Sequence, residues 1–246
     1  MRYLLLQIRD SNDPMLLNEQ LAFAQTIGCP PKAIKSHSVF NSSLTDQTIQ
    51  ESDLIIIGGS GNYSACDSDP WILQTLNDLK RIYDSKKPLF ASCWGFQALA
   101  RALGGELIHD PHRCELGTLE IQLTEAGRKD RLFSLLKSPF LAQSGHEDHV
   151  VKLPPKAILL ASTERVPHQA YTFHDRPIYA TQFHPELSMK DLLARVRQYP
   201  AYLEKMTGMR YEDFCKQTQE TPEVAQLIPE FIRQTNGTKT WNNGYL

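Results

Sequence analysis

The chain has 246 residues, of which 41% are hydrophobic and 22% are charged, so it can bury a sizeable core and is not wholly disordered. A single α/β domain can account for this length. The 26 basic residues nearly balance the 28 acidic ones, for a formal net charge of -2. This balance, with no basic run, argues against a protein that binds nucleic acid or another polyanion.

The first part of the chain alternates short apolar runs with segments of helical spacing. Strands are predicted at 3–8, 53–57 and 88–92, and helices at 14–27, 69–83 and 95–103. A glycine turn is predicted at 58–61, directly after the second strand. Because strands and helices alternate in this order, we expect parallel strands that are joined by right-handed crossovers.

The later part of the chain has shorter strands and then amphipathic helices. Strands are predicted at 118–123, 157–160, 168–173 and 177–183, with the spacing of antiparallel hairpins. The pattern is helical from Met189, with an apolar stripe at Leu192–Val196 that we expect to pack in the core. A last helix is predicted at 222–233 and a loose polar tail at 234–246.

These elements predict an α/β protein, a three-layer α/β/α sandwich with a mostly parallel central sheet and antiparallel edge strands. The predicted domain covers 1–190, and 191–246 forms a helical C-terminal extension that packs on the same domain. No apolar run approaches the ~20 residues that cross a bilayer, and the start lacks a secretory signal. The five cysteines include no C-x-x-C pair. We therefore expect a cytoplasmic protein without a membrane partner.

Cys93 lies where a predicted strand passes directly into a helix. The sequence there is Phe-Ala-Ser-Cys-Trp-Gly-Phe-Gln at 90–97, with the small residues Ala91 and Gly95 on either side of the cysteine. A tight strand-to-helix turn of this kind presents a nucleophile at the edge of a sheet, and the helix N-terminus favours negative charge there. Cys93 is thus a candidate nucleophile, with a structural buried cysteine as the alternative.

His184 lies at the end of another predicted strand, in the segment His184-Pro-Glu186. Pro185 favours an extended backbone at His184. A neutral imidazole there could accept the proton of Cys93, and Glu186 could hold the other ring nitrogen. A strand-end histidine in a polar loop is the alternative. The predicted glycine turn at 58–61 could direct backbone N–H groups at a developing oxyanion.

Together these segments resemble the class I glutamine amidotransferase family. The strand-to-helix turn at Cys93, the upstream glycine segment and the His-Pro-Glu segment 91 residues downstream of the cysteine (184 − 93) occur in the family's order. Three supporting segments are also similar to the family, at 116–124, 144–154 and 166–171. The resemblance covers about residues 1–190 and implies a flavodoxin-like fold.

The resemblance implies a catalytic triad of Cys93 as nucleophile, His184 as acid and base, and Glu186 as the residue that orients His184. It places the oxyanion hole at the backbone N–H groups of Gly59 and Trp94. Substrate would be bound by three further residues of the motifs, Gly58, Gln97 and His146. This chemistry needs no metal and no organic cofactor.

Three functions remain open from the sequence. The first is hydrolysis of the glutamine γ-amide through a γ-glutamyl thioester, with release of ammonia; a separate synthase subunit is then a candidate partner. The second is hydrolysis of γ-glutamyl peptides or γ-glutamyl amines, which needs no ammonia-accepting partner. The third is a non-catalytic binding or regulatory protein on the same scaffold. In the first two cases the main partner is a small-molecule substrate, glutamine or a γ-glutamyl compound.

Two histidine clusters allow another interpretation. His109, His112 and Cys114 could ligate zinc, but the sequence has no second paired element, so we favour a loop that borders the active site. His146 and His149 flank Glu147-Asp148, and we expect a polar loop near the catalytic face rather than a metal site.

Overall fold

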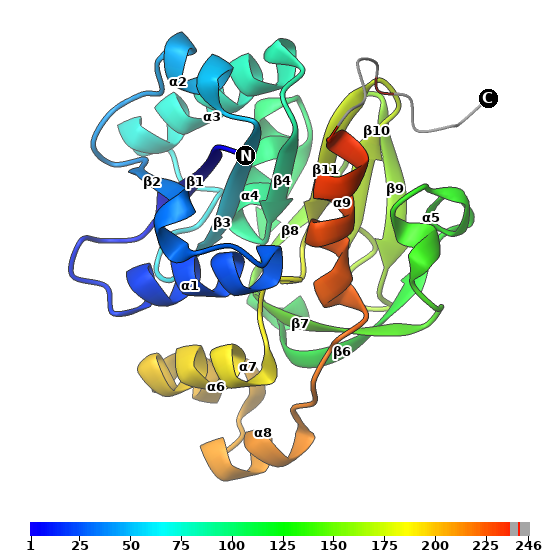
Figure 1. Cartoon of the computed structure of the whole chain (residues 1–246). Helices are drawn as coiled ribbons and strands as arrows, with labels where there is room; N and C mark the ends of the chain where they lie inside the picture. The colour runs from blue at the N-terminus through cyan, green and yellow to red at the C-terminus, as the bar shows by residue number, and fades with distance from the viewer. Residues whose placement is uncertain (237–240, 242–246) are drawn as a thin grey trace.

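A computed structural model describes residues 1–236 and residue 241, and its central feature is a mixed sheet (Figure 1). Within these residues nine strands form one sheet in the order β2-β1-β3-β4-β11-β10-β9-β6-β7. The strands from β2 to β11 pair in parallel, and those from β11 to β7 pair antiparallel. The bounds are β1 Tyr3–Ile8, β2 Ile34–Ser38, β3 Leu54–Ser60, β4 Leu89–Ser92, β6 Glu115–Leu123, β7 Phe140–His146, β9 Ala157–Ser162, β10 Ala170–Phe173 and β11 Arg176–Thr181. The predicted parallel sheet with antiparallel edge strands is confirmed.

Helices cover both faces of this sheet. Successive side chains of β1 point to opposite faces, so that Leu4 and Leu6 join one core and Leu5 joins the other. The first core also contains α3 and α4, and the second contains α1 and α9, as Figure 1 lets the reader follow. The helices are α1 Met15–Ile27, α2 Asp46–Glu51, α3 Pro70–Ser85, α4 Trp94–Ala102, α5 Glu125–Lys129, α6 Met189–Gln198, α7 Pro200–Thr207, α8 Tyr211–Gln217 and α9 Leu227–Thr235. The protein is therefore a three-layer sandwich with a flavodoxin-like arrangement, as predicted.

A smaller antiparallel pair of strands forms a second sheet, separate from the main one. It consists of β5 (Glu106–His109) and β8 (Asp148–Lys152). Short 3₁₀ turns lie at 31–33, 111–113, 133–135 and 224–226. No strand is predicted from the sequence at β2, β5, β7 or β8.

The glycine segment differs from the prediction. Strand β3 continues through Gly58 and Gly59 to Ser60, and neither glycine has a positive φ. A side chain at Gly58 would lie 2.5 Å from Glu19 Oε1, and one at Gly59 would lie 3.0 Å from His184 Cε1. The glycines therefore serve close packing at the end of a strand, and the turn predicted to begin there starts after Ser60.

Helices α6, α7 and α8 lie beside the main body, below the carboxyl edge of the sheet in Figure 1. They share a small apolar cluster of Leu192, Val196, Leu203 and Phe214, against which Leu116 of β6 packs. The predicted burial of the Leu192–Val196 stripe is confirmed. Helix α9 returns to the sheet, where Phe231 is fully buried.

The predicted tail differs at its start, because Gln234 and Thr235 belong to α9. Residues 237–240 and 242–246 of that tail lie outside the described residues. Throughout the described part of the chain, no helix combines the length and the apolar content that a membrane crossing requires.

Candidate active site

Cys93 sits at the carboxyl end of the parallel strands, between β4 and α4. Its backbone has φ 52° and ψ -107°, a conformation that side-chain-bearing residues rarely adopt. Strand β11 runs parallel to β4, and the Cys93 backbone N–H donates to the Thr181 carbonyl over 2.8 Å. This pairing brings the chain that follows β11, with His184, beside the cysteine.

His184 and Glu186 complete a buried cluster with Cys93. The His184 Nδ1–H donates to Glu186 Oε1 over 2.7 Å, and the His184 backbone N–H donates to the Gln143 carbonyl over 2.8 Å. Gly59 lies against both residues: a Cβ atom added to it would lie 3.7 Å from Cys93 Cβ and 3.8 Å from His184 Nε2. All three side chains are nearly inaccessible, with exposures of 7% for Cys93, 5% for His184 and 2% for Glu186. The structure thus brings the three predicted residues together.

The electrostatics of this cluster favour a charged imidazole. Burial alone lowers the pKa of His184, but the Glu186 carboxylate, followed by Cys93 with which the ring is hydrogen bonded, outweighs burial and raises it to about 9. For Glu186 burial raises the pKa, and the neighbouring His184 overcomes that effect and lowers it. The pair is therefore an imidazolium and a carboxylate near neutral pH.

Two backbone groups lie next to the cysteine, at the positions predicted for an oxyanion hole. Trp94 is the first residue of α4, where backbone N–H groups have no partner within the helix. Gly59 packs directly on Cys93 and His184. Gly58, in contrast, packs on Glu19 and Phe23, away from the cavity described next.

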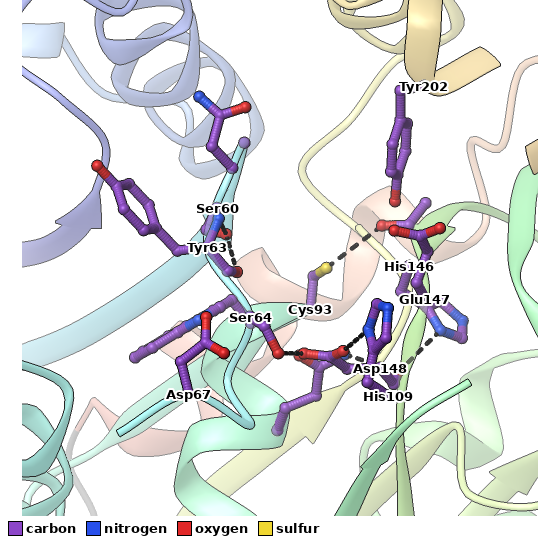
Figure 2. A pocket seen from close by; sticks show the side chains of 15 residues that line it. Ser60, Tyr63, Ser64, Asp67, Cys93, His109, His146, Glu147, Asp148 and Tyr202 are labelled. Atoms are coloured by element: carbon purple, nitrogen blue, oxygen red, sulfur yellow. Dashed lines mark hydrogen bonds and ion pairs between the residues drawn. The ribbon is translucent and has the colours of Figure 1, made fainter. Parts of the chain in front are cut away.

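A cavity of about 260 Å³ opens in front of Cys93. Figure 2 shows the sulfur pointing into it, where the thiol donates to the Gly145 carbonyl over 3.6 Å, and Tyr202 reaching in from α7. The two other predicted substrate-binding residues, Gln97 and His146, both line this cavity.

Both of these side chains also have partners within the protein. Gln97 donates to the Asp148 carbonyl over 3.0 Å and to Gln182 Oε1 over 3.1 Å. His146 Nε2 lies 3.0 Å from Glu115 Oε2. Their internal hydrogen bonds fix these two side chains in the wall of the cavity.

Sequence reasoning missed the role of Asp148 in shaping the cavity. Its carboxylate accepts from Ser64 Oγ over 2.6 Å and from the Ala65 backbone N–H over 2.9 Å, and it lies 2.8 Å from His109 Nδ1. It thereby ties the loop after β3 to the small β5–β8 sheet (Figure 2). Asp148 lies in the segment 144–154 that is similar to the family, but that similarity does not predict its hydrogen-bond partners.

His109 borders the cavity, as the non-metal interpretation of its cluster predicted. Cys114 lies elsewhere, where its thiol donates to the Met206 carbonyl over 3.4 Å. Among the residues that the structure describes, no three histidine, cysteine or acidic side chains are grouped so that they could hold a metal ion.

The fold and the site define an α/β protein with a buried cysteine–histidine–glutamate cluster at the carboxyl edge of its parallel strands. The sequence model of the family Glutamine amidotransferase class-I matches residues 21–196, more than half of the chain, and the chain belongs to this family.

Two curated relatives illustrate the likeness in sequence. The chain is 33% identical over 107 residues to a GMP synthase (glutamine-hydrolyzing) of Aliivibrio salmonicida, which covers 44% of this chain and 20% of the relative. It is 33% identical over 139 residues to the glutamine amidotransferase-like protein chyE of Penicillium rubens, which covers 55% of this chain and 56% of the relative. The chain thus spans only about a fifth of the GMP synthase that it matches.

Solved structures share the fold over nearly the whole chain. A glutamine amidotransferase of Thermotoga maritima has a TM-score of 0.77 at 16% identity and covers 97% of this chain and 99% of its own. A glutamine amido transferase of Methylobacillus flagellatus has a TM-score of 0.67 at 19% identity, covering 99% of this chain and 98% of its own.

Proposed function

We propose that this protein is a cysteine-dependent hydrolase that cleaves the γ-amide of glutamine or of a related γ-glutamyl compound. The observation that carries the proposal is the buried cluster of Cys93, His184 and Glu186, at the edge of a cavity large enough for an amino acid. Membership of the class I amidotransferase family supports it.

Each residue of the cluster has a role in the proposed reaction. Cys93 attacks the γ-carbonyl carbon as the thiolate, its proton held on His184 Nε2, and the backbone N–H groups of Gly59 and Trp94 donate to the resulting oxyanion. The carbon–nitrogen bond then breaks, and the His184 proton passes to the leaving nitrogen, which departs as ammonia or an amine. A γ-glutamyl thioester remains on Cys93.

Hydrolysis of the thioester completes the cycle. Neutral His184 accepts a proton from water, the hydroxide attacks the thioester carbon, and the Cys93 thiolate leaves. The products are glutamate and the amine released in the first half-reaction. Glu186 keeps His184 Nε2 directed at the reacting atoms throughout, because its carboxylate holds Nδ1. These steps use only protein groups and water.

The cavity suits the amino-acid end of a γ-glutamyl group. Asp67, Glu147 and Asp148 are among its lining residues and favour the α-ammonium group of such a substrate. Glu147 also pairs with Lys205 over 2.8 Å, so its charge is partly matched.

If glutamine is the substrate, a synthase subunit that takes up the released ammonia is a further part of this proposal. The matched GMP synthase is named as glutamine-hydrolyzing, and the matched region is about a fifth of its length.

The test is a steady-state assay with glutamine, in which glutamate and ammonia are both measured. We expect activity in the wild type and none in Cys93→Ser, while Cys215→Ser, which changes a half-buried cysteine of α8, keeps full activity. Labelling of Cys93 by a thiol-directed glutamine analogue, located by mass spectrometry, provides a second readout. A protein that neither hydrolyses any γ-glutamyl compound nor becomes labelled would instead be the non-catalytic scaffold.

A further inference from the structure

A smaller cavity, of about 60 Å³, lies between the reacting residues and helices α6 and α7. It shares Ser60, Gly61, Gly145 and Tyr202 with the cavity in front of Cys93, so the two adjoin. Cys93 lines the larger cavity, whereas His184 lines the smaller one. The nucleophile and the proton donor therefore face two different compartments.

This division matches the geometry that amide cleavage needs. The acyl part of the substrate must lie against the nucleophile, and the leaving nitrogen must lie near the group that gives it a proton. Because His184 gives that proton, the leaving group belongs on its side, in the smaller cavity. The larger cavity then holds the γ-glutamyl part.

Arg195 of α6 gives the smaller cavity its chemical character. Its side chain lines this cavity, and the residue is only 9% exposed. Two of its guanidinium nitrogens, Nε and Nη2, are buried and have no hydrogen-bond partner in the described part of the protein. Arg9, which also lines the cavity, is paired with Asp13 over 3.0 Å and with Glu19 over 3.5 Å. Arg9 Nε is also buried without a hydrogen bond, but Arg9 has two carboxylate partners, whereas Arg195 has no ion pair among the described residues.

Buried donors without acceptors are costly, and a guanidinium satisfies them best with a carboxylate, whose two oxygens match its planar fork. Glu186 and Glu19 contribute favourable charges at longer range, but neither forms an ion pair with Arg195 among the described residues. Glu186 accepts from His184 through Oε1, and its Oε2 is buried without a hydrogen-bond partner in the part of the chain that the structure describes. Much of the remaining wall is apolar, including Leu187, Leu192 and Val196. The cavity is therefore small and partly apolar, and it contains one buried guanidinium without an anionic partner in the described structure.

We propose that this cavity binds the carboxylate of the leaving group, so that the preferred substrate is a γ-glutamyl amide of a small amino acid. The inference rests on the proposed function and deepens it. When the thioester forms on Cys93, the carbon–nitrogen bond breaks and the proton of His184 Nε2 passes to the amino nitrogen of the departing amino acid. Arg195 meanwhile holds the carboxylate of that amino acid. Glutamine offers only ammonia here and leaves Arg195 without its partner.

The first test compares three probes with the wild-type protein. They are γ-glutamylglycine, its neutral and nearly isosteric counterpart γ-glutamylglycinamide, and glutamine. We expect a kcat/KM for γ-glutamylglycine at least about tenfold above that of either other probe, as befits charge-assisted hydrogen bonds in a buried site. Equal values, or a preference for the glycinamide, would overturn the carboxylate site and leave the proposed function standing. No hydrolysis of any probe would overturn both.

The second test assigns the preference to Arg195. In Arg195→Gln we expect the ratio of kcat/KM for γ-glutamylglycine over γ-glutamylglycinamide to fall about tenfold, and in Arg195→Lys, which keeps the charge but loses the fork, to fall less. Arg197→Gln is the matched control, because Arg197 is exposed on the same helix and stacks on Tyr211. There the ratio stays at the wild-type value.

The ratio separates recognition from a structural role. If Arg195 served only to position Glu186, its loss would slow all three probes together and leave the ratio unchanged, which would refute the assignment. If Arg195→Gln fails to fold, the comparison of the three probes with the wild type still decides the proposal.

Discussion

The substitution Glu186→Gln tests how the protein maintains a charged imidazole in a buried site. The Glu186 carboxylate raises the pKa of His184 more than any other group does, against the effect of burial. Glutamine keeps the size of the side chain and a carbonyl oxygen for His184 Nδ1–H, but removes the negative charge. Burial then dominates, and the pKa of His184 falls towards or below its ordinary value of 6.5.

The magnitude follows from the linkage between proton binding and folding. In the wild type the pKa of His184 is about 9 when folded and 6.5 as the ordinary value, so the folded state holds its proton more tightly. This stabilisation is fully present below pH 6.5 and is lost as the pH rises through 9. The difference corresponds to about 3 kcal/mol of unfolding free energy. Glu186 itself, whose pKa is lowered, contributes its own dependence only at acidic pH, outside this window.

Urea unfolding at pH 6, 7.5 and 9.5 measures this effect. We expect the wild type to be more stable than Glu186→Gln at pH 6 by an amount that shrinks by about 3 kcal/mol towards pH 9.5. Glu125→Gln is the control, because that carboxylate is 84% exposed and pairs with Lys129 on the surface. A gap between wild type and Glu186→Gln that stays constant over this range would refute the assignment of a carboxylate-stabilised imidazolium.

Three further substitutions test the site. Cys93→Ser should abolish turnover with a change of only a few degrees in Tm by circular dichroism, because a hydroxyl fits the same turn; retained activity would remove Cys93 as nucleophile. Gly59→Ala should lower kcat at least tenfold and reduce the unfolding free energy by about 1–3 kcal/mol, because the added carbon lies 3.0 Å from His184 Cε1 and must displace the buried ring; unchanged kcat would show that the ring position is not critical. Asp148→Asn should destabilise the fold by about 1–3 kcal/mol in urea unfolding and raise KM, because an amide cannot accept from both Ser64 and His109; wild-type values for both would contradict its role in the cavity wall.

Local patterns predicted the main elements well. The apolar runs gave β1 and β4 nearly to the residue and the start of β3, since strands buried on both faces are continuously apolar. The end of β3 was predicted three residues too early, because its last residues are glycines and a serine. The predicted strand-to-helix turn placed Cys93 between β4 and α4, where the structure has it. That His184 would lie beside it came only from the likeness to a family, because strand order depends on long-range pairing that no local pattern encodes.

Other features of the site could not be read from local patterns. Arg195 lies within the apolar stripe Leu192–Val196, directly before Val196. A basic residue in an amphipathic helix usually keeps its charged end in solvent. Its burial depends on how α6 lies against the sheet. Asp148 was read as part of a polar loop, yet its carboxylate accepts hydrogen bonds from a loop more than 80 residues earlier in the chain. In both cases the neighbours come from distant segments.

The strained backbone of Cys93 lowers the stability of the folded protein. A non-glycine residue at φ 52° and ψ -107° costs about 1–3 kcal/mol, a strain that glycine does not suffer. Cys93→Gly should therefore melt at a higher temperature than Cys93→Ala, reversing the usual order of these two residues. Cys93→Gly would thus have no activity but a higher Tm than Cys93→Ala. At this one position, the backbone conformation that presents the thiol lowers thermal stability.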